Sequence, residues 1–100
     1  MAMLAEKVTA QQALEWGLVY KVCEPDALLA EAHSTAAHLA EQPTRALGMI
    51  KRGFNRSLGV DIDAQLDFEE ALQREAGATA DYAEGVRAFL EKRKPSFTGA

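Results

Sequence analysis

Several features that define large classes of protein are scarce in this sequence of 100 residues. Its single cysteine, Cys23, excludes an internal disulfide and is typical of a reducing compartment, which predicts a cytoplasmic location. One cysteine and two histidines, His33 and His38, are too few for a structural zinc site. No apolar run approaches the roughly 20 residues of a membrane-spanning helix, and no secretory signal is visible. We therefore expect no metal and no membrane insertion.

The charge balance narrows the choice of partners. Lys and Arg number 11 and Asp and Glu number 15, a net charge of −4, which argues against a nucleic-acid-binding protein. The 48% of apolar and 26% of charged residues are typical of a folded globular protein. The 19 alanines outnumber the 12 Val, Ile and Thr residues, and alanine has the highest helix propensity. We therefore predict an all-α fold of about five short helices, with at most one short extended segment.

The first helix has a start and a stop signal. Thr9 and Gln12 have the spacing of a capping box, and Gly17 is placed to end the helix in the left-handed conformation. The run LVYKVC at residues 18–23 has strand-like composition and predicts a short extended segment. A lone strand needs a partner for its backbone hydrogen bonds, and no second strand is recognisable in the sequence.

Four further helices are predicted, over residues 25–41, 44–58, 61–76 and 79–94. Pro25 is expected at the first helical position, Gly77 is expected to stop the fourth helix, and Thr79 to cap the fifth. In the third helix, one face carries an apolar stripe of Leu47, Ile50, Phe54 and Leu58.

The motifs of common active sites are missing. The sequence has no Gly-rich phosphate loop, no G-x-S-x-G motif and no pair of histidines at metal-ligand spacing. The residues alone therefore predict no catalytic residue and no metal site. Residues 85–100 carry a local charge of +3, from Arg87, Lys92, Arg93 and Lys94 against Glu91. This basic end is either a solvated, ion-paired helix end or the holder of a phosphate-bearing ligand.

Three segments resemble, in order along the chain, the enoyl-CoA hydratase/isomerase (crotonase) family. They are AEKVTAQQALEWGLVYKV at residues 5–22, QPTRAL at 42–47 followed by Lys51, and TADYAEGVRAFLEKRKPSF at 79–97. Each segment alone is a modest signal, whereas three in register over nearly the whole chain are specific. The region from Gln65 to Gly85 is most similar to members that act on ring-derived acyl-CoA esters, such as the phenylacetate-pathway isomerases.

The resemblance implies that the chain, a single C-terminal domain over residues 1–100, is part of an acyl-CoA hydratase or isomerase, a lyase- or isomerase-type enzyme of fatty acid metabolism. Residues 1–23 would form the last turn of a spiral core, and residues 24–100 a helical trimerisation region. The oxyanion-hole amides and proton-moving acids would lie outside this segment. The resemblance thus implies no catalytic residue here, no activity of the segment alone, and a sheet elsewhere that pairs with residues 18–23.

Two residues are assigned a role by the resemblance. Phe89 and Lys92 match positions that contact the CoA of a neighbouring subunit, near the adenine ring and the 3′-phosphate. The implied partners are an acyl-CoA thioester and further subunits, in a trimer or a dimer of trimers, and CoA belongs to the substrate, so no separate cofactor is expected. The residues alone leave open that Phe89 is a core residue beside Val86 and Lys92 a solvated helix end, and they do not choose between Arg93 and Lys94 as supporting charges.

A second function is also compatible with the sequence. Amphipathic helices without an active site are typical of interaction modules that bind another protein. The alternative is therefore a stand-alone helical protein-interaction module with no enzymatic role.

Overall fold

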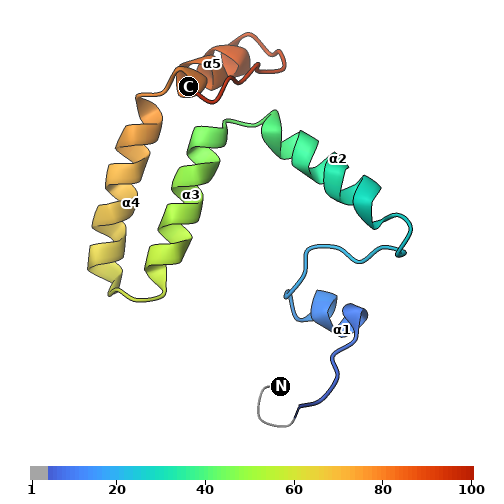
Figure 1. Cartoon of the computed structure of the whole chain (residues 1–100). Coiled ribbons are helices and arrows are strands. Elements are labelled where there is room, and N and C mark those ends of the chain that lie inside the picture. The colour runs from blue at the N-terminus through green and yellow to red at the C-terminus, as the bar shows by residue number, and fades with distance from the viewer. Residues whose placement is uncertain (1–4) are drawn as a thin grey trace. The chain divides into compact units, whose positions relative to one another are not determined.

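The computed structural model describes residues 5–100, and this part of the chain contains five α-helices and no β-strand (Figure 1). The all-α prediction is confirmed. No helix in the described range is long and apolar enough to cross a membrane. The chain divides after Ser34 into two compact units. The helices are α1 (Ala10–Glu15), α2 (Leu28–Ala40), α3 (Thr44–Ser57), α4 (Ile62–Gly77) and α5 (Ala80–Leu90).

Both end signals of α1 are confirmed. Thr9 caps the helix through its side chain, which accepts from the Gln12 amide, and the Gln12 side chain accepts from the Thr9 amide in return. Gly17 has a φ of 71°, and its amide donates to the Leu14 carbonyl while the Leu18 amide donates to Ala13. These two bonds close the end of the helix around a left-handed glycine.

Pro25 does not start a helix, so this prediction is wrong. The Ala27 amide donates to the Glu24 carbonyl at 3.0 Å, which makes Pro25 the second residue of a four-residue turn. The first regular bond of α2 follows, from the Glu31 amide to the Ala27 carbonyl. Proline fits the second position of a turn and the first position of a helix equally well, because both require the same φ. Here Pro25 lies in the turn, and α2 begins at Leu28.

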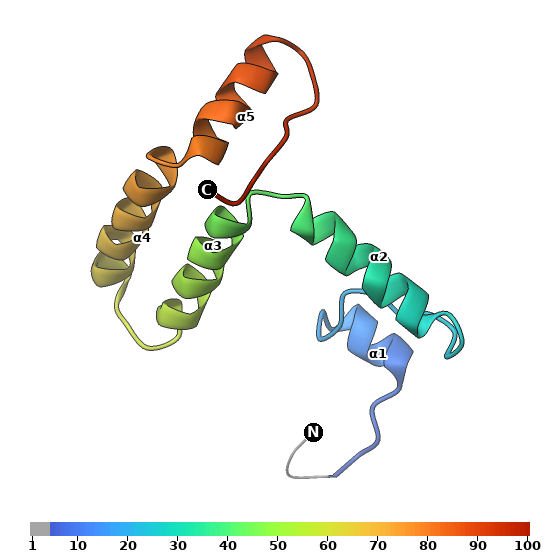
Figure 2. The same ribbon diagram turned by 45° about the horizontal axis from the view of Figure 1, so that its top comes forward.

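Helices α3 and α4 form an antiparallel hairpin in the second unit (Figures 1 and 2). Met49 and Gly53 of α3 are buried against α4, where Leu72 and Gln65 are buried. Gly53 lies against Leu72: a β-carbon at Gly53 would stand 3.7 Å from Leu72 Cδ1, an ordinary van der Waals distance. The Gln65 amide group donates to the Gly53 carbonyl at 3.1 Å. This contact is the small core of the unit.

The predicted apolar stripe on α3 is largely exposed in the described chain. Ile50, Phe54 and Leu58 are 55%, 71% and 91% exposed. The residues of α3 that are buried in the hairpin are Met49 and Gly53. The stripe is left as an apolar surface.

The basic residues of α3 are mostly engaged with α4. Arg52 pairs with Glu75 at 3.0 Å, and Arg45 approaches the same carboxylate at 3.7 Å. The Arg56 guanidinium lies 4.6 Å from the centre of the Phe68 ring. The positive charge of this helix is thus largely balanced within the hairpin.

The prediction that Gly77 stops α4 is wrong. The helix includes Gly77 as its last residue, and Ala78 is the C-cap. The φ angle of Gly77 is not positive, so it does not act as a left-handed stop. The capping of the next helix by Thr79 ends α4 instead. The Thr79 hydroxyl donates to the Ala76 carbonyl at 2.7 Å and accepts from the Tyr82 amide, so one side chain serves both helix ends.

Gly48 provides a first test of this fold. No atom lies within 4 Å of where its β-carbon would stand, so Gly48→Ala should raise the free energy of unfolding by up to about 1 kcal/mol through helix propensity. Gly99→Ala is the matched control. Gly99 has a φ of 80° and its β-carbon would lie 2.6 Å from Thr44 Oγ1, so this variant should be less stable. Denaturant unfolding followed by circular dichroism measures both, and a loss of stability in Gly48→Ala would contradict the packing described.

Candidate functional site

Helix α5 ends four residues earlier than the sequence predicts, at Leu90. The Lys92 amide donates to the Phe89 carbonyl at 3.2 Å and the Arg93 amide to the Ala88 carbonyl at 3.0 Å, which closes the last turn. Lys92 has a φ of 53°, so it occupies the left-handed position that glycine usually takes. The predicted end of this helix at residue 94 is therefore wrong, and Lys92 lies beyond the helix that contains Phe89. A lysine at this position gives no stop signal in the sequence.

The segment after α5 turns back along the helix, as Figure 2 shows. Asp81, in the first turn of α5, is 3% exposed and accepts from the backbone amides of Thr98 and Gly99 at 2.7 and 2.8 Å. Its own amide donates to the Ala100 carbonyl at 3.1 Å. The ring of Phe97 lies on Gly85, 3.6 Å from where a β-carbon would stand. The last residues of the chain are thus bound to α5 by specific hydrogen bonds.

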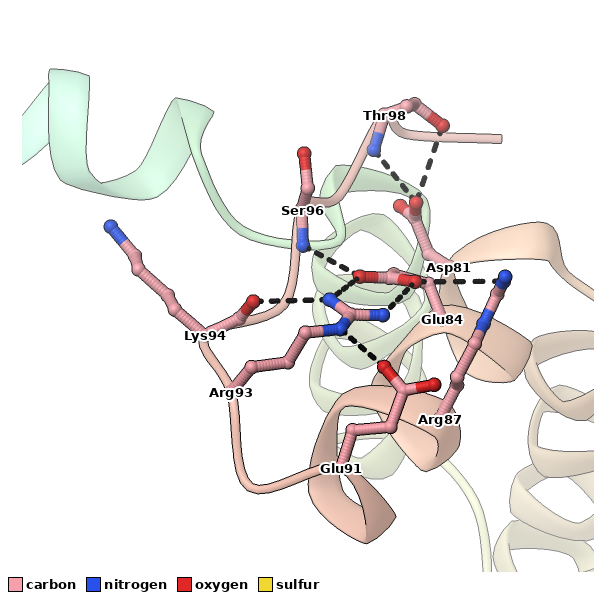
Figure 3. Close-up of polar contacts among 8 residues, drawn as sticks. All are labelled: Asp81, Glu84, Arg87, Glu91, Arg93, Lys94, Ser96 and Thr98. Carbon is pink, nitrogen blue, oxygen red and sulfur yellow. Dashed lines mark hydrogen bonds and ion pairs between the residues drawn. The ribbon is translucent and has the colours of Figure 1, made fainter.

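Glu84 holds the middle of the same segment (Figure 3). Both of its carboxylate oxygens accept from the Arg93 guanidinium, at 2.6 and 3.0 Å, and one also accepts from the Ser96 amide at 3.0 Å. Arg93 Nε donates to Glu91 at 2.6 Å. Two-pronged pairing of this kind fixes both partners in orientation.

The hydrogen bond from Arg93, and second that from Ser96, lower the pKa of Glu84 from its ordinary 4.5 to about 2, and the contact with Glu84 raises the pKa of Arg93. A carboxylate whose pKa is lower in the folded than in the unfolded chain stabilises the fold at pH values above the unfolded-state pKa. This contribution is lost as the pH falls through the folded-state pKa. The Glu84 contacts therefore stabilise the fold fully above about pH 4.5 and weaken toward pH 2.

Phe89 lies at the edge of an open groove of about 420 Å³. The side chain is 82% exposed, so the interpretation of Phe89 as a core residue beside Val86 is wrong for the described chain. Tyr82, Val86 and Leu90 line the groove with it on α5, and Phe97 lines it from the returning segment. An exposed aromatic ring beside an apolar groove can stack on a flat ligand ring.

Lys92 is the one cation of the run 92–94 that makes no ion pair within residues 5–100. Arg93 is held by Glu84 and Glu91, and Lys94 lies 3.5 Å from Glu41. The sequence leaves open which of these three charges is available to a ligand. In the structure Arg93 and Lys94 are in ion pairs, and Lys92 is not. The structure thus brings an exposed ring and a free positive charge to the same end of α5.

Sequence reasoning missed the residues that build this end of the molecule. Asp81 and Glu84 have the spacing of a single helix face, but this spacing does not indicate that they hold the returning segment. The only available signal was that spacing. His33 and His38 are exposed on α2, and no cluster of three or more His, Cys, Asp or Glu residues suited to a metal occurs in the described part of the chain.

Comparison with known proteins adds independent information. The family model described as enoyl-CoA hydratase/isomerase matches residues 1–100. The 1,2-epoxyphenylacetyl-CoA isomerase of Escherichia coli K12 is 48% identical over 99 residues, which are 99% of this chain and 38% of that protein. The trans-2-decenoyl acyl-carrier-protein isomerase of Streptococcus mutans is 38% identical over the same shares of the two chains. The chain thus spans about two-fifths of the length of these relatives.

Solved structures show the same relationship in three dimensions. An enoyl-CoA hydratase of Geobacillus kaustophilus matches 98% of this chain with a TM-score of 0.90 and 32% sequence identity, over 37% of its own length. The fold of this chain is thus similar to that of a region of that enzyme. Because the family model covers every residue and both sequence and fold agree with it, this chain belongs to the enoyl-CoA hydratase/isomerase family.

Proposed function

We propose that this chain is the C-terminal part of an acyl-CoA hydratase or isomerase, where it contacts the nucleotide end of CoA and contributes to subunit assembly. Two features at the C-terminal end of α5 carry the proposal. Phe89 is exposed, and Lys92 has no ion-pair partner within residues 5–100. An aromatic ring stacks on adenine, and an ammonium is a compact positive charge for a phosphate. The groove supports this because Phe89 lines it and is itself largely exposed.

The nucleotide is proposed to belong to the active site of a neighbouring subunit, as the family resemblance implies. CoA is then part of the substrate, and no other cofactor is needed. The chemical step is proposed to use groups outside this segment: backbone amides that stabilise a thioester enolate and a carboxylate that moves the proton. No residue of this chain is assigned a catalytic role.

The exposed apolar surface supports a role in assembly. Ile50 and Phe54 line a second groove, of about 320 Å³, between α3 and α4, and both side chains are more than half exposed. Apolar surface of this kind on a small unit is typical of an interface. We propose that it is covered in the full-length protein, in a trimer or a dimer of trimers located in the cytoplasm.

The substrate class is proposed from similarity. The 48% identity to an isomerase of 1,2-epoxyphenylacetyl-CoA supports a ring-derived acyl-CoA ester, with a role in acyl-CoA breakdown related to fatty acid metabolism. The alternative, a stand-alone helical interaction module without enzymatic role, is not favoured, because the match to the enzyme family extends over the whole chain.

Turnover by the full-length protein, meaning a protein of the relatives' length that contains this segment, tests the proposal. Offered crotonyl-CoA and 1,2-epoxyphenylacetyl-CoA separately, it should convert at least one of them, with the product separated from the substrate by liquid chromatography before mass spectrometry, because an isomer has the substrate's mass. Gly48→Ala serves as the control variant and should leave turnover unchanged, since Gly48 lies outside the proposed site. Binding to an unrelated protein with no conversion of either ester would favour the interaction module instead.

A further inference from the structure

Arg93 connects the parts of the chain on both sides of Lys92. Its guanidinium donates to Glu84 on α5, to Glu91 before Lys92 and to the Lys94 carbonyl after it, the last at 3.2 Å (Figure 3). Its backbone amide also closes the end of α5 through Ala88. One residue thus joins the helix to both flanks of the turn that contains Lys92.

The turn needs such support because its central residue is not glycine. Lys92 has a φ of 53°, a region that side chains with a β-carbon seldom occupy. A residue there keeps its conformation only when surrounding contacts hold it. Glu84 supplies the anchor. Its side chain is 15% exposed, and its carboxylate accepts both prongs of Arg93 and a further bond from the Ser96 amide beyond the turn.

We infer that the Glu84–Arg93 pair is a positioning device that holds the backbone at Lys92 so that its ammonium meets a phosphate group of the ligand. The inference rests on the proposed contact between Lys92 and the CoA nucleotide. Glu84 and Arg93 act through Lys92 and do not touch the ligand. Because its guanidinium is neutralised by two carboxylates, Arg93 is not itself the phosphate-binding charge.

The test compares ion pairs in the full-length protein. Glu84→Gln removes the negative charge that holds Arg93. Glu70→Gln is the matched control, because Glu70 forms an exposed ion pair with Arg74, and both of these residues lie on α4. Glu84→Gln should raise the KM for a CoA ester by roughly two- to tenfold, the lower part of the range for residues coupled through one ion-pair network, and leave kcat unchanged. Glu70→Gln should change neither constant.

Two further measurements separate positioning from general stability. Pantetheine esters lack the nucleotide, so Glu84→Gln should use them as well as the unmodified protein does. In addition, Glu84→Gln combined with Lys92→Ala should be no worse than Lys92→Ala alone, because the pair acts only through Lys92. Arg93→Lys keeps the charge but loses the two-pronged contact, and should give an intermediate KM even if Glu84→Gln folds poorly.

The outcomes distinguish this inference from the proposed function. If Lys92→Ala raises the KM for the CoA ester and neither Glu84→Gln nor Arg93→Lys does, the positioning role is wrong and the nucleotide contact stands. If both ester types suffer equally in Glu84→Gln, the pair is structural only and the inference is overturned. If Lys92→Ala itself has no effect on the CoA ester, the proposed nucleotide contact fails and this inference fails with it.

Discussion

Lys92→Ala in the full-length protein should raise the KM for a CoA ester by about five- to 150-fold, equivalent to roughly 1–3 kcal/mol for a charged phosphate contact, with the lower end applying where water screens the ammonium. The kcat should stay nearly unchanged. The nucleotide is remote from the reacting carbons, so its binding energy is shared by the ground state and the transition state. Steady-state kinetics over a range of ester concentrations measures both constants.

Two controls isolate the nucleotide contact of Lys92. Pantetheine esters should be used equally well by Lys92→Ala and the unmodified protein. Lys94→Ala should leave the KM for the CoA ester near its original value, because Lys94 is paired with Glu41 at 3.5 Å. Equal losses with both types of ester would mean that Lys92 supports the assembly and does not bind the ligand.

The purified 100-residue chain should convert no enoyl-CoA or epoxyacyl-CoA ester, whereas the full-length protein should. The proposal places the oxyanion-hole amides and the proton-moving carboxylate outside the segment. The strongly perturbed carboxylate within it, Glu84, has its pKa lowered by Arg93 and is held in ion pairs, which makes it a poor proton carrier near neutral pH. Product formation at high chain concentration, compared with a boiled sample, is the measurement. Turnover above that background would contradict the placement of the active site.

Local signals in the sequence predicted most helix ends correctly. The capping box at Thr9 and the left-handed Gly17 are confirmed because each depends on residues only a few positions apart. Thr79 is likewise the N-cap of α5. Pro25 shows the limit of such rules. A proline has the same φ in a turn and in the first turn of a helix, so its presence does not distinguish them.

Contacts between distant residues were beyond prediction from the sequence. The apolar stripe of α3 indicates a helix face but not what covers it: Met49 and Gly53 are buried in the hairpin, whereas Ile50 and Phe54 stay largely exposed. Likewise, Asp81 accepts backbone amides from residues 17 and 18 positions away. Backbone amides have no sequence signature, so the return of the C-terminal segment could not be read from the residue types.

The candidate site combines residues chosen from the sequence with a geometry seen only in the structure. The family resemblance singled out Phe89 and Lys92, and the structure leaves the first exposed and the second without an ion pair within residues 5–100. The geometry that joins them was not foreseen. α5 ends at Leu90 because Lys92 takes the left-handed conformation, and nothing in the residue type of lysine indicates this.

The central claim is that Lys92 binds a phosphate at the nucleotide end of CoA, and the most direct measurement compares CoA with 3′-dephospho-CoA. Calorimetric titration of the full-length protein and of Lys92→Ala gives four dissociation constants and hence one coupling energy. The unmodified protein should bind CoA more tightly than 3′-dephospho-CoA, and in Lys92→Ala the ratio of the two constants should fall to about one. An unchanged ratio in Lys92→Ala would contradict the claim.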